Sequence, residues 1–399
     1  MLINELRASK VMDAAGLDGL VSSRLENLYY LSGIYNANMK GFPYELQCYA
    51  VVSRDKLTAP IAVMSTGDWD QSRMAFAGLR GTVTFGTFTR ELPDGVELTA
   101  MEQEAKSQTI DRKPRASALD ALVVVLEELG LSKKRVGIDE TVFNLAYFAE
   151  LPKRLPKLTV VPAAALFRKI RMVKTRAEVE RLRHAAHVTE TAIQSALSIA
   201  KAGVTEKELN RRFRTSISEQ DGDPSLSLFR IGRNGAFGQI PSDDTPLRKG
   251  DMVWLDVACT VNGYWADLAR IFCLGEPSKK LRTYYDAVLA GEDHGFAVCR
   301  PGMTAGELFD ATVQAVKEKG IPHYKRHHVG HGIGLEVYDV PLIGPGQKDL
   351  IEAGMVINIE TPYYEIGWGA VHIEDPFFVG GNGNEWLTKT SRDLAIIPD

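Results

Sequence analysis

The chain has 399 residues, of which 45% are hydrophobic and 25% are charged, and its formal net charge is -4. This balance is typical of a folded globular protein and excludes a fibrous or disordered chain. The acidic charge and the lack of a long apolar run argue against nucleic acid, an anionic lipid surface or a bilayer as a partner.

The first part of the chain alternates helical and strand patterns, which predicts an α/β domain over residues 1–165. Its N-terminus carries charges at Glu5, Arg7 and Lys10 and lacks the apolar core of a secretion signal. The expected elements are a helix at 3–15, strands at 17–23, 48–53, 59–65 and 135–140, a helical turn at 27–33 and a helix at 117–130. The stretch LPKRLPKLTVVPA leads to the domain boundary.

The second part, residues 166–399, shows a different pattern. A charged helix is expected to begin at Thr175, which is followed by Glu178 as in a capping box, and to stop at Gly203. Further helices are expected at 205–220, 278–297 and 304–319, and strands at 251–260, 264–273, 355–360 and 370–379. Because adjacent strands are joined as hairpins, we expect an α+β domain with an antiparallel sheet.

Four cysteines, Cys48, Cys259, Cys273 and Cys299, are scattered without C-x-x-C spacing. This pattern suggests neither a disulfide framework nor a zinc knuckle, and we expect a cytoplasmic protein.

Two aspartates lie on the hairpin DMVWLDVACTVNGYWADLARIF. The dipeptide Asn262-Gly263 is a strong hairpin-turn signal, and it places Asp256 opposite Ala269 and Asp267 opposite Ala258. Both carboxylates then share one face as diagonal neighbours about 7–8 Å apart at Cα, close enough to hold a metal centre. A solvent-facing aspartate is the ordinary alternative, but the apolar residues around them weaken it because buried carboxylates need a partner.

The segment HHVGHGIGLEVYD contains His331 between glycines 330, 332 and 334. These glycines let the backbone approach whatever His331 contacts. Neutral imidazole is a common ligand of divalent metals, whereas a single histidine is more often structural. The glycine spacing favours the metal-ligand interpretation.

Two glutamates, Glu360 and Glu374, each lie within an apolar strand pattern. A charge in such a place is costly unless it is compensated. Together with Asp256 and Asp267 they exceed what nearby basic residues can neutralise, so the sequence predicts divalent cations as the counter-charge.

The order D-x10-D, GHGIG, IE and IED resembles the ligand signature of the pita-bread metallopeptidases, which include methionine aminopeptidase, aminopeptidase P and prolidase, with creatinase as a relative. The resemblance covers residues 175–399. The first half resembles the creatinase/prolidase N-terminal domain, on phrases such as NLYYLSG and RMVKTRAEVERLR.

The resemblance implies that Asp256 holds one metal ion, that Asp267 and Glu374 bridge two, and that His331 and Glu360 complete the set. It also implies that a metal-activated water attacks an amide or related C–N bond of an Xaa-Pro dipeptide-like substrate, with Glu360 as general base. The ligands suit manganese, cobalt, iron or zinc, and the family implies a homodimer.

Three positions depart from the family pattern. Gln239 and Tyr338 stand where Xaa-Pro peptidases have histidines that contact the substrate, and His372 replaces a frequent arginine. Tyr338 and Gln239 can still donate hydrogen bonds to an oxyanion. The alternative is that Tyr338 packs in the core and that His328 or His372 performs the catalytic role.

Other candidates for substrate contact are weaker. Arg230, Arg233 and Arg270 could clamp a carboxylate, and Asp339 could bind a substrate ammonium, although surface positions are the ordinary expectation for each. Trp69 and Tyr35 of the first domain could also reach the site.

We therefore expect an Xaa-Pro dipeptidase or a related aminopeptidase. The altered positions leave open a non-peptidase hydrolase or lyase of a small carboxylated metabolite, creatinase-like or like the metal-dependent dimethylsulfoniopropionate lyases. A binding protein that has lost catalysis is disfavoured by the five intact ligands.

Overall fold

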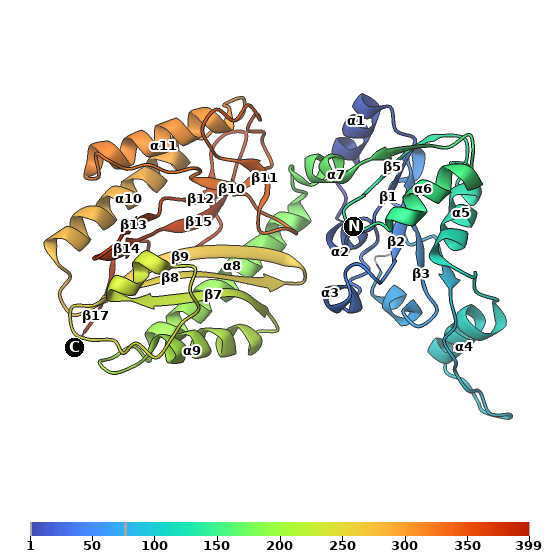
Figure 1. The fold of residues 1–399 in the computed structure, drawn as a ribbon, viewed down its shortest axis with the longest axis horizontal. Coiled ribbons are helices and arrows are strands. Elements are labelled where there is room, and N and C mark those ends of the chain that lie inside the picture. The colour runs from blue at the N-terminus through green and yellow to red at the C-terminus, as the bar shows by residue number, and fades with distance from the viewer. Residues whose placement is uncertain (1, 76–77, 399) are drawn as a thin grey trace. The chain divides into compact units, whose positions relative to one another are not determined.

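A computed structural model describes residues 2–75 and 78–398. The chain divides into two compact units, Met1–Arg171 and Met172–Asp399 (Figure 1). The division falls after the expected residue 165 because helix α7 (Ala164–Arg171) packs against α1 (Glu5–Ala15) and so belongs to the first unit.

The first unit is built around a six-stranded mixed sheet with the strand order β4-β3-β2-β1-β5-β6. Its strands are β1 (Gly19–Val21), β2 (Tyr49–Ser53), β3 (Ile61–Ser65), β4 (Gly81–Phe85), β5 (Arg135–Ile138) and β6 (Thr159–Pro162). The other helices of this unit are α2 (Leu25–Ser32), α3 (Asn38–Gly41), α4 (Ala100–Lys106), α5 (Ala118–Glu128) and α6 (Leu145–Arg154). Helix α5 packs on β2, β3 and β4, and its apolar face forms much of the core.

The second unit contains a nine-stranded sheet with the main order β11-β10-β12-β15-β9-β8-β7. These strands are β7 (Asp223–Ile231), β8 (Met252–Val261), β9 (Tyr264–Leu274), β10 (Gly330–Gly332), β11 (Asp339–Leu342), β12 (Val356–Glu360) and β15 (Glu374–Phe378). Strand β16 (Glu385–Trp386) pairs with β15, and β17 (Ala395–Ile397) adds a parallel pair to β9. A separate pair consists of β13 (Tyr363–Glu365) and β14 (Gly369–Val371).

Four long helices cover this sheet. Helix α8 (Arg176–Leu197) packs on β8 and β9, and α9 (Glu206–Ser218) packs on β7. Helices α10 (Lys279–Val298) and α11 (Ala305–Lys319) pack on each other, and α10 also contacts β12. Figure 1 shows the sheet between these two helix pairs. No helix among residues 2–75 and 78–398 is both long and apolar enough to cross a membrane.

The structure confirms the predicted α/β first part and α+β second part, with two local corrections. Helix α8 ends at Leu197, before Gly203, because the next residues turn through i→i−3 backbone bonds. The strand expected at 370–379 is two strands, since β14 pairs with β13 and β15 pairs with β12. The break falls at His372 and Ile373, next to Glu374.

Candidate metal centre

The hairpin of β8 and β9 has the predicted register. Asn262 and Gly263 adopt φ values of 50° and 80°, which the right-handed twist of a two-residue hairpin turn requires. Asp256 pairs with Ala269 and Asp267 pairs with Ala258. Both aspartates therefore lie on one face of the sheet, each beside an alanine that leaves space above it.

Strand β15 brings a third carboxylate to the same place. Glu374 pairs with Ala269 from the side opposite Asp256, so these three residues form one row across β8, β9 and β15. Asp267 lies two residues before Ala269 on β9 and shares its face. Ala269 lies between Asp256 and Glu374 in this row and has only a methyl group. The carboxylates of Asp256 and Glu374 can therefore converge above it.

Strand β12 contributes the fourth carboxylate. Glu360 is the direct cross-strand partner of Glu374, a pairing that is unfavourable between two like charges. Asn358, also on β12, donates a hydrogen bond from Nδ2 to Glu374 Oε1. Glu360 and Glu374 are only 5% and 3% exposed, so water does not screen the repulsion between their carboxylates.

His331 on β10 is oriented as a metal ligand should be. Its Nδ1–H donates to the carbonyl oxygen of Gly332 over 3.0 Å, which leaves Nε2 with a free lone pair. Nε2 lies 3.7 Å from Glu374 Oε1. A Cβ at Gly330 or Gly332 would lie 2.4 Å from Asn358 O or 2.2 Å from Val340 O. The glycines are therefore needed for the close passage of this strand, as the sequence suggested.

Three of the buried carboxyl groups have raised pKa values. Removal from water, and then the neighbouring carboxylates, raise the pKa of Asp267 and Glu374 well above their ordinary values. Burial likewise raises the pKa of Asp256 to about 6. Within the described part of the chain, the ion pairs of these residues and Glu360 involve histidines and no arginine or lysine.

The residues present fit divalent metal ions. Two groups of three residues can each offer ligand atoms that lie within 4.8 Å of one another. One group is Asp256, His372 and Glu374, and the other is Asp267, His331 and Glu374. Asp267 Oδ1 and His331 Nε2 are buried and have no hydrogen-bond partner among the described residues. Buried polar atoms are normally satisfied, and a cation between these atoms would satisfy both.

Glu360 is linked to two residues that the sequence singled out. Its Oε1 lies 2.7 Å from Nε2 of His328, and that nitrogen lies 3.2 Å from the hydroxyl of Tyr338. Burial opposes the charge of Glu360, but the contacts with His328 and His372 outweigh it and hold its pKa well below the usual value. Glu360 therefore stays ionised and can accept a proton.

Tyr338 does not pack in the core, which was the alternative for this residue. It is 46% exposed, and its ring stacks on His331 with 3.8 Å between centroids. Tyr338 therefore covers one ligand while it presents its hydroxyl beside Glu360 and His328.

A cavity of about 460 Å³ opens onto this cluster. Gln239, Tyr338, His328, Asp256 and Glu360 line it, so the structure brings these expected residues together. The remaining lining residues were not predicted from the sequence: Ala236, Phe237, Gly238, Ile240, Arg326, His327 and Tyr364. The run KRHH just before the glycine-rich segment was the available signal for Arg326.

The structure places two predicted substrate contacts elsewhere, since Arg230 and Asp339 are not among the residues that line this cavity. Arg230 is 3% exposed and forms a buried ion pair with Glu206 over 2.7 Å. Asp339 is buried with Lys174, at 3.9 Å. Both have structural partners far away in the sequence.

The weaker candidates also have other contacts. Arg270 forms a two-pronged pair with Asp375, with distances of 2.8 and 2.7 Å. Trp69 is buried within the first unit, and the ring of Tyr35 lies edge-on to Tyr29 in the same unit. Arg233 is exposed and does not line the cavity.

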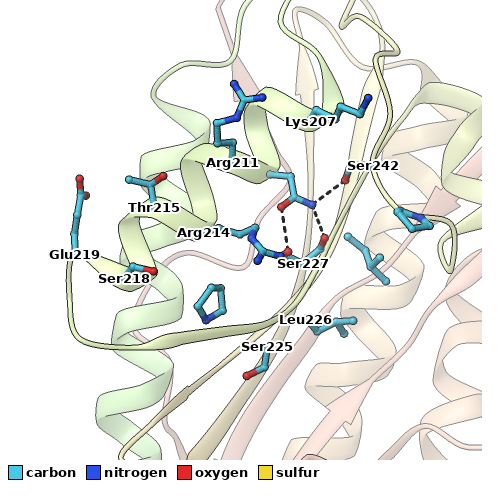
Figure 2. A pocket seen from close by; sticks show the side chains of 14 residues that line it. Lys207, Arg211, Arg214, Thr215, Ser218, Glu219, Ser225, Leu226, Ser227 and Ser242 are labelled. Atoms are coloured by element: carbon cyan, nitrogen blue, oxygen red, sulfur yellow. Dashed lines mark hydrogen bonds between the residues drawn. The ribbon is translucent and has the colours of Figure 1, made fainter. Parts of the chain in front are cut away.

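A second, larger cavity of about 930 Å³ lies between α9 and β7. Figure 2 shows Lys207, Arg211 and Arg214 on α9. Asn210 of the same helix forms hydrogen bonds with Ser227 and Ser242. The lining of the cavity contains neither a histidine nor any predicted ligand. This larger cavity therefore offers no predicted metal ligand.

Comparison with known families decides the classification. The model of metallopeptidase family M24 matches residues 180–380, and the model of the creatinase/prolidase N-terminal domain matches residues 89–173. The chain belongs to metallopeptidase family M24. It is thus a metal-dependent hydrolase with the pita-bread fold, as its sequence motifs suggested.

Individual relatives agree with membership of family M24. An uncharacterized peptidase of Bacillus subtilis is 28% identical over 284 residues, 70% of this chain and 80% of that protein. An Xaa-Pro dipeptidase of Pyrococcus furiosus is 31% identical over 227 residues, 56% of this chain and 65% of that protein. A dipeptidase structure from Pyrococcus horikoshii OT3 has a TM-score of 0.78 and 25% identity, covering 98% of this chain and 99% of that one.

Proposed function

We propose that this protein is an Xaa-Pro dipeptidase that works with two divalent metal ions. The observation that carries the proposal is the convergence of four carboxylates and two imidazoles on one sheet face without a lysine or arginine among their described ion-pair partners. Relatives named as Xaa-Pro dipeptidases support the substrate class and disfavour the non-peptidase alternative.

Asp256, Asp267, His331, Glu360 and Glu374 would hold the ions. Divalent ions at these positions supply a water of lowered pKa and polarise a carbonyl oxygen. Mixed carboxylate and imidazole ligands suit manganese, cobalt, iron or zinc.

Glu360 is the proposed general base. Because its pKa is held low, it is ionised at neutral pH and can take a proton from the attacking water and pass it to the leaving nitrogen. His328 lies against the same carboxylate and would keep it in place, and Tyr338 offers a hydroxyl donor at the cavity wall. Together they would take over the roles of the histidines that this chain lacks.

The cavity has features that suit a dipeptide. Its volume of about 460 Å³ falls in the range of small-ligand sites. Phe237, Ile240 and Tyr364 offer apolar surface for a pyrrolidine ring, and Arg326 offers a guanidinium for the terminal carboxylate. Gln239 can donate a hydrogen bond to the substrate from the same wall.

We also infer a cytoplasmic location and a homodimer. All four cysteines are free and buried, which suits a reducing compartment. The dimer is an expectation from the family resemblance, and sedimentation of the purified protein tests it.

The decisive experiment measures proline release from Xaa-Pro dipeptides by chelated protein that is reloaded with manganese, cobalt, iron or zinc. Xaa-Ala dipeptides, betaines and guanidino acids form the comparison panel. We expect metal-dependent proline release and little turnover of the others. Turnover of a betaine or guanidino acid without proline release would instead establish the non-peptidase alternative.

A further inference from the structure

His372 occupies an unusual place in the sheet. It lies in the break between β14 and β15, two residues before Glu374, and its Nε2 is 3.4 Å from Glu374 Oε2. The imidazole is 1% exposed although it is polar. Burial of such a group without partners is costly, so its surroundings should show what it binds.

The ring of His372 is held in one orientation by Trp254. The two rings stack at an interplanar angle of 21°, with centroids 5.9 Å apart. Trp254 lies on β8 two residues before Asp256, so the two side chains share one face of the strand. A single strand thus positions both Asp256 and the ring of His372.

Nε2 of His372 points into the acidic cluster. It lies 3.4 Å from Glu374 Oε2 and 3.6 Å from Glu360 Oε2. Neither ring nitrogen has a hydrogen-bond partner among the described residues. The ligand atoms of Asp256, His372 and Glu374 lie within 4.8 Å of one another, as do those of Asp267, His331 and Glu374.

We propose that His372 is a direct ligand of the metal ion held by Asp256 and Glu374. The centre then consists of two similar halves, each with one aspartate and one histidine, that share Glu374. This inference rests on the proposed function for the presence of two ions, and it adds a ligand to the set carried over from the family resemblance.

A second imidazole changes which metals the site prefers. Nitrogen donors raise affinity for cobalt, nickel and zinc relative to manganese, which is better served by oxygen ligands. Cobalt binds more tightly than manganese at most sites, so we expect the loss of His372 to reduce the preference of the wild-type protein for cobalt and not to abolish it.

Two variants distinguish a role of His372 as a metal ligand from a role as a positive charge beside the carboxylates. His372→Phe keeps a flat ring to stack on Trp254 but has no nitrogen, and His372→Arg brings a fixed positive charge to the carboxylates but does not bind metal. His294→Phe is the matched control, because His294 is exposed on α10. Circular dichroism of each protein establishes that it is folded, and either folded variant suffices for the test.

The experiment titrates chelated protein with cobalt and, separately, manganese by calorimetry, and follows the visible absorption of cobalt. We expect two ions per wild-type chain. In both His372 variants one ion should bind at least about tenfold more weakly, with a larger loss for cobalt than for manganese and a changed absorption band. The His294→Phe protein should match the wild type.

The proposal is overturned if folded His372→Phe or His372→Arg protein binds two ions with wild-type affinity and an unchanged cobalt spectrum, or if the wild type binds fewer than two. Proline release is measured on the same wild-type sample. His372-dependent binding of two ions without proline release would leave the ligand assignment standing and refute only the proposed substrate.

Discussion

Glu360 and Glu374 face each other as direct partners on adjacent antiparallel strands, and the side chains of both are almost fully buried. An arrangement of this kind is unstable when both groups are charged and nothing lies between them. The carboxylate cluster should therefore lower the stability of the metal-free protein, and bound metal should raise it.

Metal binding should stabilise the protein, and Glu374→Gln should remove that effect. At a pH high enough to ionise Glu374, the metal-free variant should be about 1 kcal/mol more stable than the metal-free wild type, because the variant lacks one buried charge. An ion at 100 times its Kd should add about 2.7 kcal/mol per site to the wild type but little to the variant, since Glu374 belongs to both ligand groups. Chemical denaturation with chelator or excess cobalt measures this, and Glu318→Gln on the surface of α11 is the control.

The hydroxyl of Tyr338 should matter for turnover and not for metal binding. Tyr338→Phe keeps the ring that stacks on His331 but loses the donor beside His328 and Glu360. We expect kcat to fall about tenfold with unchanged metal content, since one hydrogen bond to a developing charge is worth about 1.4 kcal/mol or more. Tyr363→Phe, whose hydroxyl bonds Glu365 outside the cavity, should keep full activity. An unchanged kcat for Tyr338→Phe would assign the residue to packing alone.

Arg326 should recognise the carboxylate of a dipeptide. Arg326→Ala should raise KM for an Xaa-Pro dipeptide at least tenfold while KM for the corresponding dipeptide amide changes little, because only the free carboxylate loses a charged partner. Arg211→Ala removes an arginine from the other cavity and should change neither value. Equal effects of Arg326→Ala on the acid and the amide would contradict this assignment.

Stability should fall as the pH rises, and Glu178 is one cause. Burial raises the pKa of this carboxyl to about 7, above its usual value of 4.5. The folded state thus binds this proton more tightly than the unfolded state, so the contribution is full below about pH 4.5 and is lost as the pH rises through 7. The loss is on the order of 3 kcal/mol at most. Glu178→Gln can still accept the backbone bond from Thr175, and its denaturation free energy should be flatter between pH 5 and 8. The same slope in both proteins would refute this origin.

The parts of the site that rest on local chemistry could be predicted from the sequence. Asn262-Gly263 dictates a two-residue turn, and that turn fixes the register that brings Asp256 and Asp267 to one face. The glycines around His331 were also read correctly, because close backbone passage leaves no room for a side chain.

Contacts between distant segments could not be predicted in this way. Arg230 and Asp339 were predicted to contact a substrate, whereas the structure pairs them with Glu206 and Lys174. Nothing in the local pattern of either residue indicates those partners. His372 was expected at the site, but its relation to Trp254 depends on the way β8, β9 and β15 assemble.

The proposed ligands come from two groups of strands that are neighbours in one sheet but far apart in sequence, the β8–β9 hairpin and the strands β10, β12 and β15. Bringing these strands together requires the closure of long loops, which costs conformational entropy. The ligand atoms therefore meet late in folding, and the partly folded chain offers no complete metal site. Metal should therefore leave the refolding rate almost unchanged and should slow unfolding.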